Sequence, residues 1–395
     1  MMESCVLTIN GGSSSIKFAL YSAEEAPTCL LSGKVERIGL AEARFKADLP
    51  GKQREDRPVD APDHRSAGAL VIDWIEGQVG FGAVCGIGHR VVHGGSNYSE
   101  PQRVTPPLLT ELRRLKPYDP EHLPSEIQLI ELFRRRFPKL PQVVCFDTSF
   151  HREMPRVARI LPIPRRFESR GIERYGFHGL SYAYLIGELG RVAGAQAAQG
   201  RVVLAHLGNG ASLAAVRDGK GIDTSMGFTP TAGVPMSSRS GDLDPGLVWY
   251  LARTEKITAK QFHHLVNHES GLLGVSETSP DMRDLLAREG EDVRAAEAVA
   301  LFCYQLKKWI GGFAAALGGL DTLVFAGGIG ENGAVVRARI CAGLEFLGVQ
   351  LDETRNNVHA SVISAEASPV TVRVIRTNEE VVIAKAVGRV LGLAI

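Results

Sequence analysis

Short apolar runs alternate along the chain with longer amphipathic stretches. The runs are rich in β-branched residues and bounded by Gly, Pro, Asn or Asp, a pattern that predicts strands. They read "VLTIN", "IKFALY", "CGIGHRVV", "QVVCFDT", "RVVLAHL", "DTLVFAGG" and "VRVIRTN". Between them, "PSEIQLIELFRRRF" places Ile127, Ile130, Leu132 and Phe133 toward one side of a helix, and "EAVALFCYQLKKWIGGFAAAL" is apolar enough for a central helix. Strands mixed with helices in both halves predict an α/β fold.

Two segments about half a chain apart repeat one pattern. "TINGGSSSIKF" and "RVVLAHLGNGASLAAVRDGK" each read as a strand, a Gly-rich polar turn and a second strand. The first segment could bind a phosphate. The donors would be its backbone N–H groups, the hydroxyls of Ser13, Ser14 and Ser15, and the ammonium group of Lys17. An ordinary β-turn is the alternative. The repetition predicts a duplicated fold in which each half presents one glycine turn to a shared cleft.

The first turn is not a Walker phosphate loop. That loop needs Gly-Lys-Ser/Thr followed by a helix, whereas Lys17 is followed by "FALY", a strand pattern. Residues 41–66 are charged and interrupted by proline, and they predict a surface excursion such as a hairpin, without chemistry.

Length and composition narrow the function classes. A chain of 395 residues favours two domains. With 45 Lys and Arg against 44 Asp and Glu, it has no general attraction for nucleic acid or anionic membrane. The six cysteines form no C-x-x-C pair, which favours reduced thiols over a zinc or redox site. No secretory signal pattern opens the chain, and "WIGGFAAALGGL" is too short to span a bilayer, so we expect a cytoplasmic protein.

Eleven motifs in order resemble those of the acetate kinase family, which shares a superfamily with sugar kinases, actin and the heat-shock chaperone ATPases. They are "TINGGSSSIKF", "GHRVVHGG", "FDTSFH", "RYGFHG", "HLGNGAS", "SMGFTP", "RSGDLDPG", "SGLLGVS", "DMRDL", "FAGGIGEN" and "TNEE". The resemblance covers nearly the whole chain. It implies two similar actin-like (ribonuclease H-like) α/β domains with the active site in the cleft between them. The expected domains are 1–149 plus 380–395, with the C-terminal helix packing back, and 150–379.

The resemblance implies reversible phosphoryl transfer between ATP and acetate, giving ADP and acetyl phosphate, with Mg²⁺ (or Mn²⁺) in a homodimer. An acetate carboxylate is already a nucleophile at pH 7, so catalysis should depend on positioning and on cationic charge around the phosphoryl group. Arginine forks suit that purpose. The implied catalytic residues are Arg90, Asp147, His178 and Arg239. Asp147 follows a strand, and we expect it to orient an arginine or a metal-bound water rather than to abstract a proton.

The resemblance also implies the binding residues. Arg90, Val92, His122, Phe177 and Pro230 would bind the acid, the apolar ones shaping a pocket for its methyl group. The ATP contacts would be Lys17, His206, Leu207, Gly208, Asn209, Gly210, Asp281, Met282, Arg283, Gly328, Ile329, Gly330, Glu331 and Asn332. Asn10 and Glu379 match the metal positions, and we expect Glu380 to face the opposite way from Glu379.

Glu121, Tyr182 and the segment "VPMSSR" depart from the family pattern, and several functions compete. Glu121 falls where leucine is common, which leaves propionate open as the preferred acid, and Tyr182 replaces a common histidine. One methylene changes the binding of an acid by only about 1–3 kcal/mol. A sugar kinase would want an aspartate base, which Asp147 could supply. A non-catalytic nucleotide switch would lack Arg90, His178 and Arg239. A Rossmann dinucleotide site at "GGIGEN" is disfavoured because no strand and acidic partner follow it.

Overall fold

The computed structural model describes residues 4–393. The chain forms two compact units, Met1–Ser149 with Asn378–Ile395, and Phe150–Thr377. Asn378 and Glu379 therefore belong to the first unit, whereas the boundary expected from the sequence followed Glu379.

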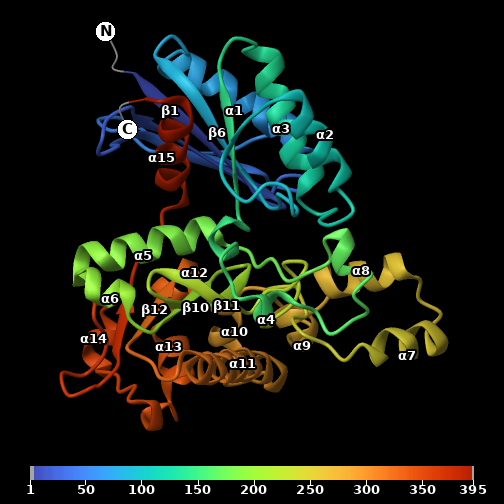
Figure 1. Ribbon diagram of the computed structural model, residues 1–395, viewed down its shortest axis with the longest axis vertical. Helices are drawn as coiled ribbons and strands as arrows, with labels where there is room; N and C mark the ends of the chain where they lie inside the picture. Colours follow the sequence, from blue (N-terminus) through green and yellow to red (C-terminus); the bar gives the residue numbers. More distant parts are fainter. Residues whose placement is uncertain (1–3, 394–395) are drawn as a thin grey trace. The chain divides into compact units, whose positions relative to one another are not determined.

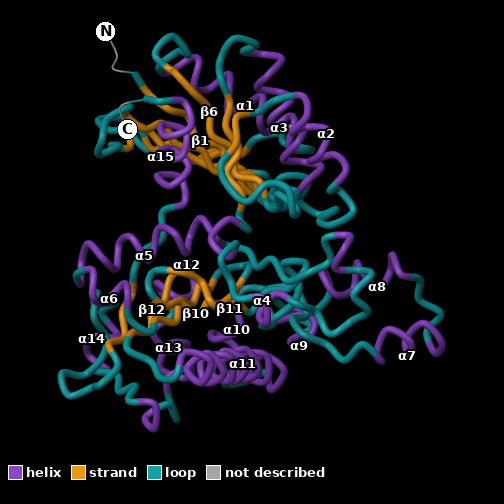
Figure 2. Tube along the Cα trace, viewed as in Figure 1, coloured by secondary structure: helices purple, strands orange, loops and turns teal. Residues whose placement is uncertain are grey.

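The first unit is built on one sheet (Figures 1 and 2). Its strand order is β5-β4-β3-β2-β1-β6-β8-β7. The strands are β1 (Cys5–Gly11), β2 (Ser15–Ser22), β3 (Cys29–Glu36), β4 (Arg44–Asp48), β5 (Glu55–Pro58), β6 (Val84–Val91), β7 (Gln102–Arg103) and β8 (Gln142–Phe146). β1, β2 and β3 pair antiparallel, whereas β1, β6 and β8 pair parallel. The hairpin expected within residues 41–66 is confirmed, because β4 and β5 pair antiparallel at one edge.

Four helices cover this sheet. They are α1 (His64–Gln78), α2 (Pro106–Arg114), α3 (Leu123–Arg136) and α15 (Glu379–Leu391). A Cβ atom on Gly88 would lie 2.3 Å from Ile383 of α15, so this glycine lets the helix approach β6 closely. Side chains alternate along a strand, and Ile87 packs with Phe133 of α3 in the core on the other face. The C-terminal helix thus packs back on the first sheet, beside β1 (Figure 1).

The second unit repeats the strand order of the first. Its sheet runs β11-β10-β9-β12-β13, which corresponds to β3-β2-β1-β6-β8. The strands are β9 (Val202–Leu207), β10 (Ala211–Arg217), β11 (Lys220–Thr224), β12 (Thr322–Ala326) and β13 (Thr371–Val374). β9, β10 and β11 again pair antiparallel, and β9, β12 and β13 pair parallel. The predicted duplication of an α/β fold is confirmed.

The second unit also carries helices, and some of them pack on its sheet. They are α4 (Arg156–Arg159), α5 (Gly179–Ala193), α6 (Ala195–Gln199), α7 (Gly246–Thr254), α8 (Ala259–His268), α9 (Gly271–Ser276), α10 (Met282–Arg288), α11 (Val293–Leu317), α12 (Gly327–Asn332), α13 (Ala334–Cys341) and α14 (Glu353–Asn357). The predicted central helix is confirmed as α11, which packs on β10, α9 and α10. α5 packs Tyr182 and Leu185 into a core with Leu204 of β9. Among the helices of residues 4–393, none is long and apolar enough to cross a membrane.

Candidate functional site

Both glycine segments are tight hairpin turns, as the sequence predicts. After β1, the N–H of Gly12 donates to the carbonyl oxygen of Ser15 at 2.7 Å. After β9, the N–H of Gly208 donates to the carbonyl oxygen of Gly210 at 3.0 Å. His64 Nε2 lies 2.7 Å from the carbonyl oxygen of Gly12, so the stretch 41–66, expected to have no chemistry, contributes one side chain to the first turn.

Arg90 and Asp147 meet at the carboxyl ends of two parallel strands. Arg90 lies at the end of β6, and Asp147 directly follows β8. The guanidinium donates through Nε (3.0 Å) and Nη2 (2.5 Å) to Asp147 Oδ2. Its Nη1 donates to the carbonyl oxygen of Gly11 at 2.7 Å. Asp147 therefore contacts an arginine, as its expected orienting role requires, and Arg90 is fixed against the first glycine turn.

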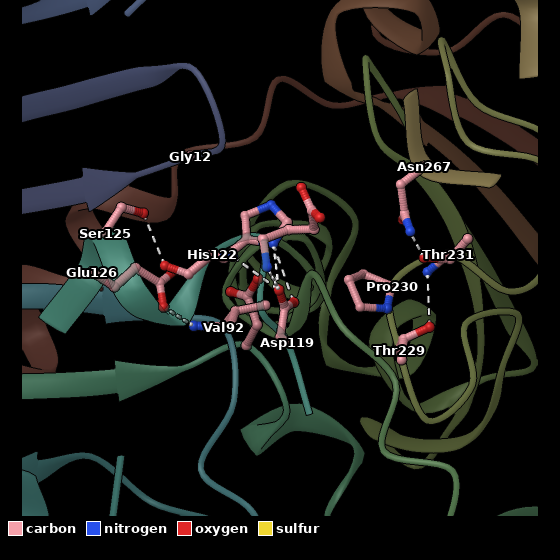
Figure 3. A network of polar contacts seen from close by, with 12 residues as sticks. Gly12, Val92, Asp119, His122, Ser125, Glu126, Thr229, Pro230, Thr231 and Asn267 are labelled. Carbon is pink, nitrogen blue, oxygen red and sulfur yellow. Dashed lines mark hydrogen bonds and ion pairs between the residues drawn. The ribbon is translucent and has the colours of Figure 1, made fainter. Parts of the chain in front are cut away.

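A second carboxylate, Glu126 of α3, also reaches Arg90. Its Oε1 lies 3.4 Å from Arg90 Nη1, and its Oε2 accepts from the N–H of Val92 at 3.0 Å (Figure 3). The side chain is 1% exposed. Glu126 therefore holds both the arginine and the backbone of the residue expected to line the acid pocket.

Burial and ion pairing act against each other on the pKa values of this cluster. Burial raises the pKa of Asp147, against the opposing effect of Arg90, and Glu379 raises it further. Burial also raises the pKa of Glu126, to about 8, although Arg90 opposes that shift. For Arg90, burial alone would lower the pKa, but Asp147 and Glu126 outweigh it and the pKa is raised. Arg90 is therefore a permanent cation, whereas burial favours the neutral form of Glu126.

Asn10 joins the first strand to the C-terminal helix. Its Nδ2 donates to Glu379 Oε2 at 2.8 Å and to Glu380 Oε1 at 3.3 Å. The expectation that Glu380 faces away from Glu379 is wrong. The two residues open α15, where neighbouring side chains diverge by about 100° rather than by the 180° of a strand.

The oxygens near Asn10 fit a hard divalent cation. The amide oxygen of Asn10 and the carboxylate of Glu379 are ligands that Mg²⁺ accepts. Asp147 Oδ1 is buried and has no hydrogen-bond partner among residues 4–393, so this oxygen is available to a cation or to water bound to one. Within that range no group of three or more His, Cys, Asp or Glu could hold a metal. Mg²⁺ often takes one or two protein ligands when phosphates and water complete its shell.

The remaining predicted residues of the first unit lie in different surroundings. Lys17 is exposed on β2 and pairs across the hairpin with Asn10, so the two side chains share one face of the sheet. His122 is buried, and its Nδ1 lies 3.0 and 3.1 Å from the two carboxylate oxygens of Asp119 (Figure 3). Val92 is buried, and Glu121 is half-buried.

In the second unit, two stacked imidazoles lie beside the glycine turn. His178 has a left-handed backbone, with φ 58° and ψ 24°, directly before α5. A non-glycine residue held in this region commonly marks a functional site. The rings of His178 and His206 lie 4.4 Å apart at 28°. Ser212 Oγ lies 2.8 Å from His178 Nδ1, and Ser181 Oγ lies 2.8 Å from His206 Nδ1.

Arg239 and Gly210 complete this face of the second unit. A Cβ atom on Gly210 would lie 3.2 Å from His178 Nε2 and 3.6 Å from Arg239 Nη1. Arg239 Nη1 donates to the carbonyl oxygen of Pro230 at 3.0 Å. Phe177, directly before His178, is buried. The structure therefore brings the predicted catalytic residues of this unit together around the turn.

The "GGIGEN" segment packs against the same turn. α12 begins at Gly327, whose φ of +75° and 2.6 Å Cβ approach to the carbonyl oxygen of Leu207 require glycine. Glu331 Oε1 accepts from the N–H groups of Gly327 and Thr377, and Asn332 donates to the carbonyl oxygen of Gly328. These side chains stabilise the segment itself. α13 follows α12 without an intervening strand, unlike a Rossmann unit.

The third segment that was predicted to contact ATP lies at the beginning of a helix. Asp281 is the N-cap of α10, and its side chain accepts from the N–H of Arg283 at 2.9 Å. Arg283 is 89% exposed and pairs with Asp281, while Met282 is buried. Their contact with ATP stays a prediction.

Sequence reasoning missed the groups that support the predicted residues: Asp119, Glu126, Ser181 and Ser212. Glu126 carried a detectable signal, because it stands on the buried stripe of α3 among Leu123, Ile127 and Ile130. An ionisable residue on such a stripe is rarely buried unless it is paired. No comparable sequence signal marked the serines.

Comparison with known proteins decides the family. Residues 5–385 match the model of the acetokinase family. The chain belongs to the acetokinase family. Acetate kinase of Rhodopseudomonas palustris is 44% identical over 394 residues, covering 98% of each chain. Propionate kinase of Citrobacter rodentium is 43% identical over 394 residues, covering 98% of this chain and 97% of its own.

Solved structures agree with this membership. The acetate kinase of Porphyromonas gingivalis is 35% identical, with a TM-score of 0.87 over 98% of this chain and 100% of its own. A propionate kinase of Francisella tularensis is 32% identical, with a TM-score of 0.91 over 98% of this chain and 99% of its own. The resemblance inferred from the motifs and the expected actin-like α/β fold of the acetokinase family are confirmed.

Proposed function

We propose that this acetokinase family member is an acetate kinase. A carboxylate oxygen of acetate forms a bond to the γ-phosphorus of ATP, the bond from that phosphorus to the β–γ bridging oxygen breaks, and ADP leaves with the electron pair. The reverse reaction regenerates ATP from acetyl phosphate. The observation that carries the proposal is Arg90, a half-buried permanent cation aligned by Asp147 at the first glycine turn.

The first unit supplies positive charge that reduces the repulsion between the acid carboxylate and the γ-phosphate of ATP. We assign to Arg90 the binding of both the acid and the transferring phosphoryl group. Asp147 aligns it through Nε and Nη2, so its donors are fixed before the substrates bind. Because burial favours the neutral form of Glu126, this side chain adds less negative charge near the incoming anions than an exposed carboxylate would. Asp147 acts here as an orienting group and not as a base.

The second unit supplies further donors for the transition state. His178 Nε2 and Arg239 Nη1 flank Gly210, and we assign both to the equatorial oxygens of the transferring phosphoryl group. We assign ATP binding to the backbone N–H groups of two segments, 207–210 and 328–332. Further contacts with ATP would come from Lys17, His206 and the segment 281–283. The close packing of Gly327 on Leu207 supports one nucleotide site built from both glycine segments.

Asn10 and Glu379 would hold Mg²⁺, and Mn²⁺ in its place, with Asp147 Oδ1 facing a water of its shell. When bound, the cation neutralises phosphate charge. The pairing of Asn10 with Glu379 keeps the carboxylate in position for that purpose.

Propionate is the alternative acid. The similar proteins include enzymes named for either acid. Val92, Phe177 and Pro230 are each buried and apolar, and we assign to them the contacts that choose between the acids. Glu121, which departs from the family pattern, is half-buried, so its carboxylate need not face an apolar pocket. We therefore place acetate first.

We also propose a homodimer in the cytoplasm, where ATP and ADP are available. The second unit carries a pocket of about 620 Å³ whose lining includes Leu243, Leu301 and Trp309. Leu243 is 43% exposed, and Tyr304 of α11 is 59% exposed. A second copy of the chain would bury such apolar surface. Analytical ultracentrifugation should give twice the mass of one chain, and a single-chain mass at micromolar concentration would refute the dimer.

A trapping assay tests the proposed reaction. The protein is incubated with ATP, Mg²⁺, hydroxylamine and acetate, propionate or butyrate, and the acyl hydroxamate is measured. We expect acetate to give the highest kcat/KM. A higher value for propionate would establish the alternative, and no hydroxamate with any acid would refute a carboxylate kinase.

A further inference from the structure

Each of the two stacked imidazoles, His178 and His206, is hydrogen-bonded to a serine, and each serine is bonded to another hydroxyl. Ser212 Oγ joins His178 Nδ1 (2.8 Å) to the hydroxyl of Tyr182 (2.5 Å). Ser181 Oγ joins His206 Nδ1 (2.8 Å) to Thr377 Oγ1 (2.8 Å). The two chains of hydrogen bonds therefore begin at neighbouring rings and end at different kinds of hydroxyl.

The local fold explains how Tyr182 reaches its place. Ser181 and Tyr182 stand three and four residues after His178, so all three side chains lie over one face of the first turns of α5. Ser212 of β10 pairs directly with His206 of β9, which places both on one face of the sheet. α5 thus carries Tyr182 onto Ser212 from the same side as His178.

The proton positions in the Tyr182 chain follow from counting donors. Tyr182 is completely buried, and Ser212 Oγ is the one hydrogen-bond partner of its hydroxyl within residues 4–393. Burial raises the pKa of Tyr182, so the phenol keeps its proton. A buried O–H that does not donate is costly, so Tyr182 donates to Ser212. The proton of Ser212 is then directed at His178 Nδ1, which accepts it.

We propose that Tyr182 is a positioning residue that acts through Ser212 to keep His178 in the tautomer with its proton on Nε2. This inference rests on the proposed function, in which His178 donates to the phosphoryl group. Nε2 is the nitrogen beside Gly210 and Arg239. In the other tautomer, Nε2 would present a lone pair to a phosphoryl oxygen, and the two would repel each other.

The neighbouring ring provides an internal comparison. Ser181 and Thr377 both carry aliphatic hydroxyls that can donate or accept, so donor counting does not fix the direction of that chain. The tautomer of His206 should therefore not depend on Tyr182. A tyrosine at position 182 is a departure from the family pattern, and the inference gives that departure a chemical role.

The test reads the tautomer directly. Protein labelled with ¹⁵N in its histidines is examined by NMR correlation of ring nitrogens with ring protons, and His178→Asn identifies the His178 signals. Asn suits the control because it tolerates the left-handed backbone at this position. We expect His178 to be protonated on Nε2 in the native protein. In Tyr182→Phe, Ser212 becomes free to accept, and we expect a mixture containing the Nδ1-protonated form.

Kinetics provide the second readout, with Tyr184→Phe on the same helix as the matched control. We expect Tyr182→Phe to lower kcat about 5- to 10-fold, the value of one neutral hydrogen bond, with KM for both substrates within about twofold. Tyr184→Phe should leave kcat and the His178 signals unchanged. An Nδ1-protonated His178 in the native protein, or an unchanged tautomer in Tyr182→Phe, would overturn the inference.

The same variants separate this inference from the proposed function. Full turnover in His178→Asn would refute the catalytic role of His178, whatever its tautomer. A large loss in His178→Asn, combined with native kinetics and an unchanged tautomer in Tyr182→Phe, would overturn the positioning role of Tyr182 alone.

Discussion

The two units share one strand order but present different chemistry beside their glycine turns. The first turn faces an ionic cluster, in which Arg90 contacts Asp147, Glu126 and the carbonyl oxygen of Gly11. The second turn lies beside imidazoles whose partners are the hydroxyls of Ser181 and Ser212. The backbone pattern fixes where a ligand can approach, whereas the side chains at the strand ends decide which charge is met there.

This difference predicts that the two units respond differently to mutation. Removing a charge from the ionic cluster leaves buried partners without compensation, which affects folding as well as catalysis. Removing a donor from the second unit should affect turnover more selectively.

Arg90→Ala should have the largest effect. It removes the cation proposed to hold both anions, and we expect kcat to fall by about 10³-fold or more. It also leaves Asp147 buried and unpaired, at a cost of about 3–5 kcal/mol in the free energy of unfolding. Steady-state kinetics and urea denaturation measure the two effects.

The double variant Arg90→Ala/Asp147→Asn separates these effects. Replacing the orphaned carboxylate by an amide should restore much of the stability and none of the turnover. If the double variant regained activity together with stability, Arg90 would have a structural role only.

Arg239→Ala should be nearly as damaging to turnover but less so to folding. We expect kcat to fall about 10²- to 10³-fold, because a donor to the transferring phosphoryl group is lost. The half-buried side chain donates to a backbone carbonyl, that of Pro230, so the free energy of unfolding should change by about 1 kcal/mol. A loss of stability equal to that of Arg90→Ala would remove the contrast between the units.

Glu379→Ala should change the metal dependence. We expect the Mg²⁺ concentration for half-maximal rate to rise by about tenfold or more, since a proposed ligand is lost. Glu380→Ala is the matched control: it removes the longer, 3.3 Å contact to Asn10 and should change the titration less. Identical Mg²⁺ titrations for native protein and Glu379→Ala would disprove the assignment.

Glu126→Gln should change the pH dependence of stability. The pKa of Glu126 is raised in the folded protein from an ordinary value of 4.5 to about 8. Its contribution to stability is therefore fully present below pH 4.5 and is lost as the pH rises through about 8. Gln does not titrate, so the folding constant of the native protein should fall relative to Glu126→Gln by up to about tenfold per pH unit over that range.

Urea denaturation of both proteins between pH 5 and 8.5 measures this difference. Parallel profiles would show that Glu126 is ionised throughout, and the first turn would then face one more negative charge than we propose.

The sequence predicted features that depend on local pattern. The two hairpins followed from apolar runs on either side of Gly11 and Gly208, and the central helix from its long apolar face. Asp147 could be singled out because a polar residue that follows a strand lies at the carboxyl edge of an α/β sheet, whereas Arg90 was indicated by the resemblance to the acetate kinase family.

Features that depend on contacts between distant residues could not be predicted. Glu126 is 36 residues from Arg90, and Tyr182 is 30 residues from Ser212. No feature of the sequence around either residue of such a pair indicates its distant partner. The orientation expected for Glu380 was wrong because it assumed strand geometry at a position where α15 begins.

The central claim is that this protein transfers a phosphoryl group from ATP to a carboxylate, and that its cationic groups stabilise the transfer. ³¹P NMR of the protein with ATP, Mg²⁺ and acetate tests it most directly, because it observes every phosphorus species at once. We predict that acetyl phosphate and ADP appear in equal amounts, and that Arg90→Ala abolishes both. Formation of ADP and inorganic phosphate without acetyl phosphate would contradict the account.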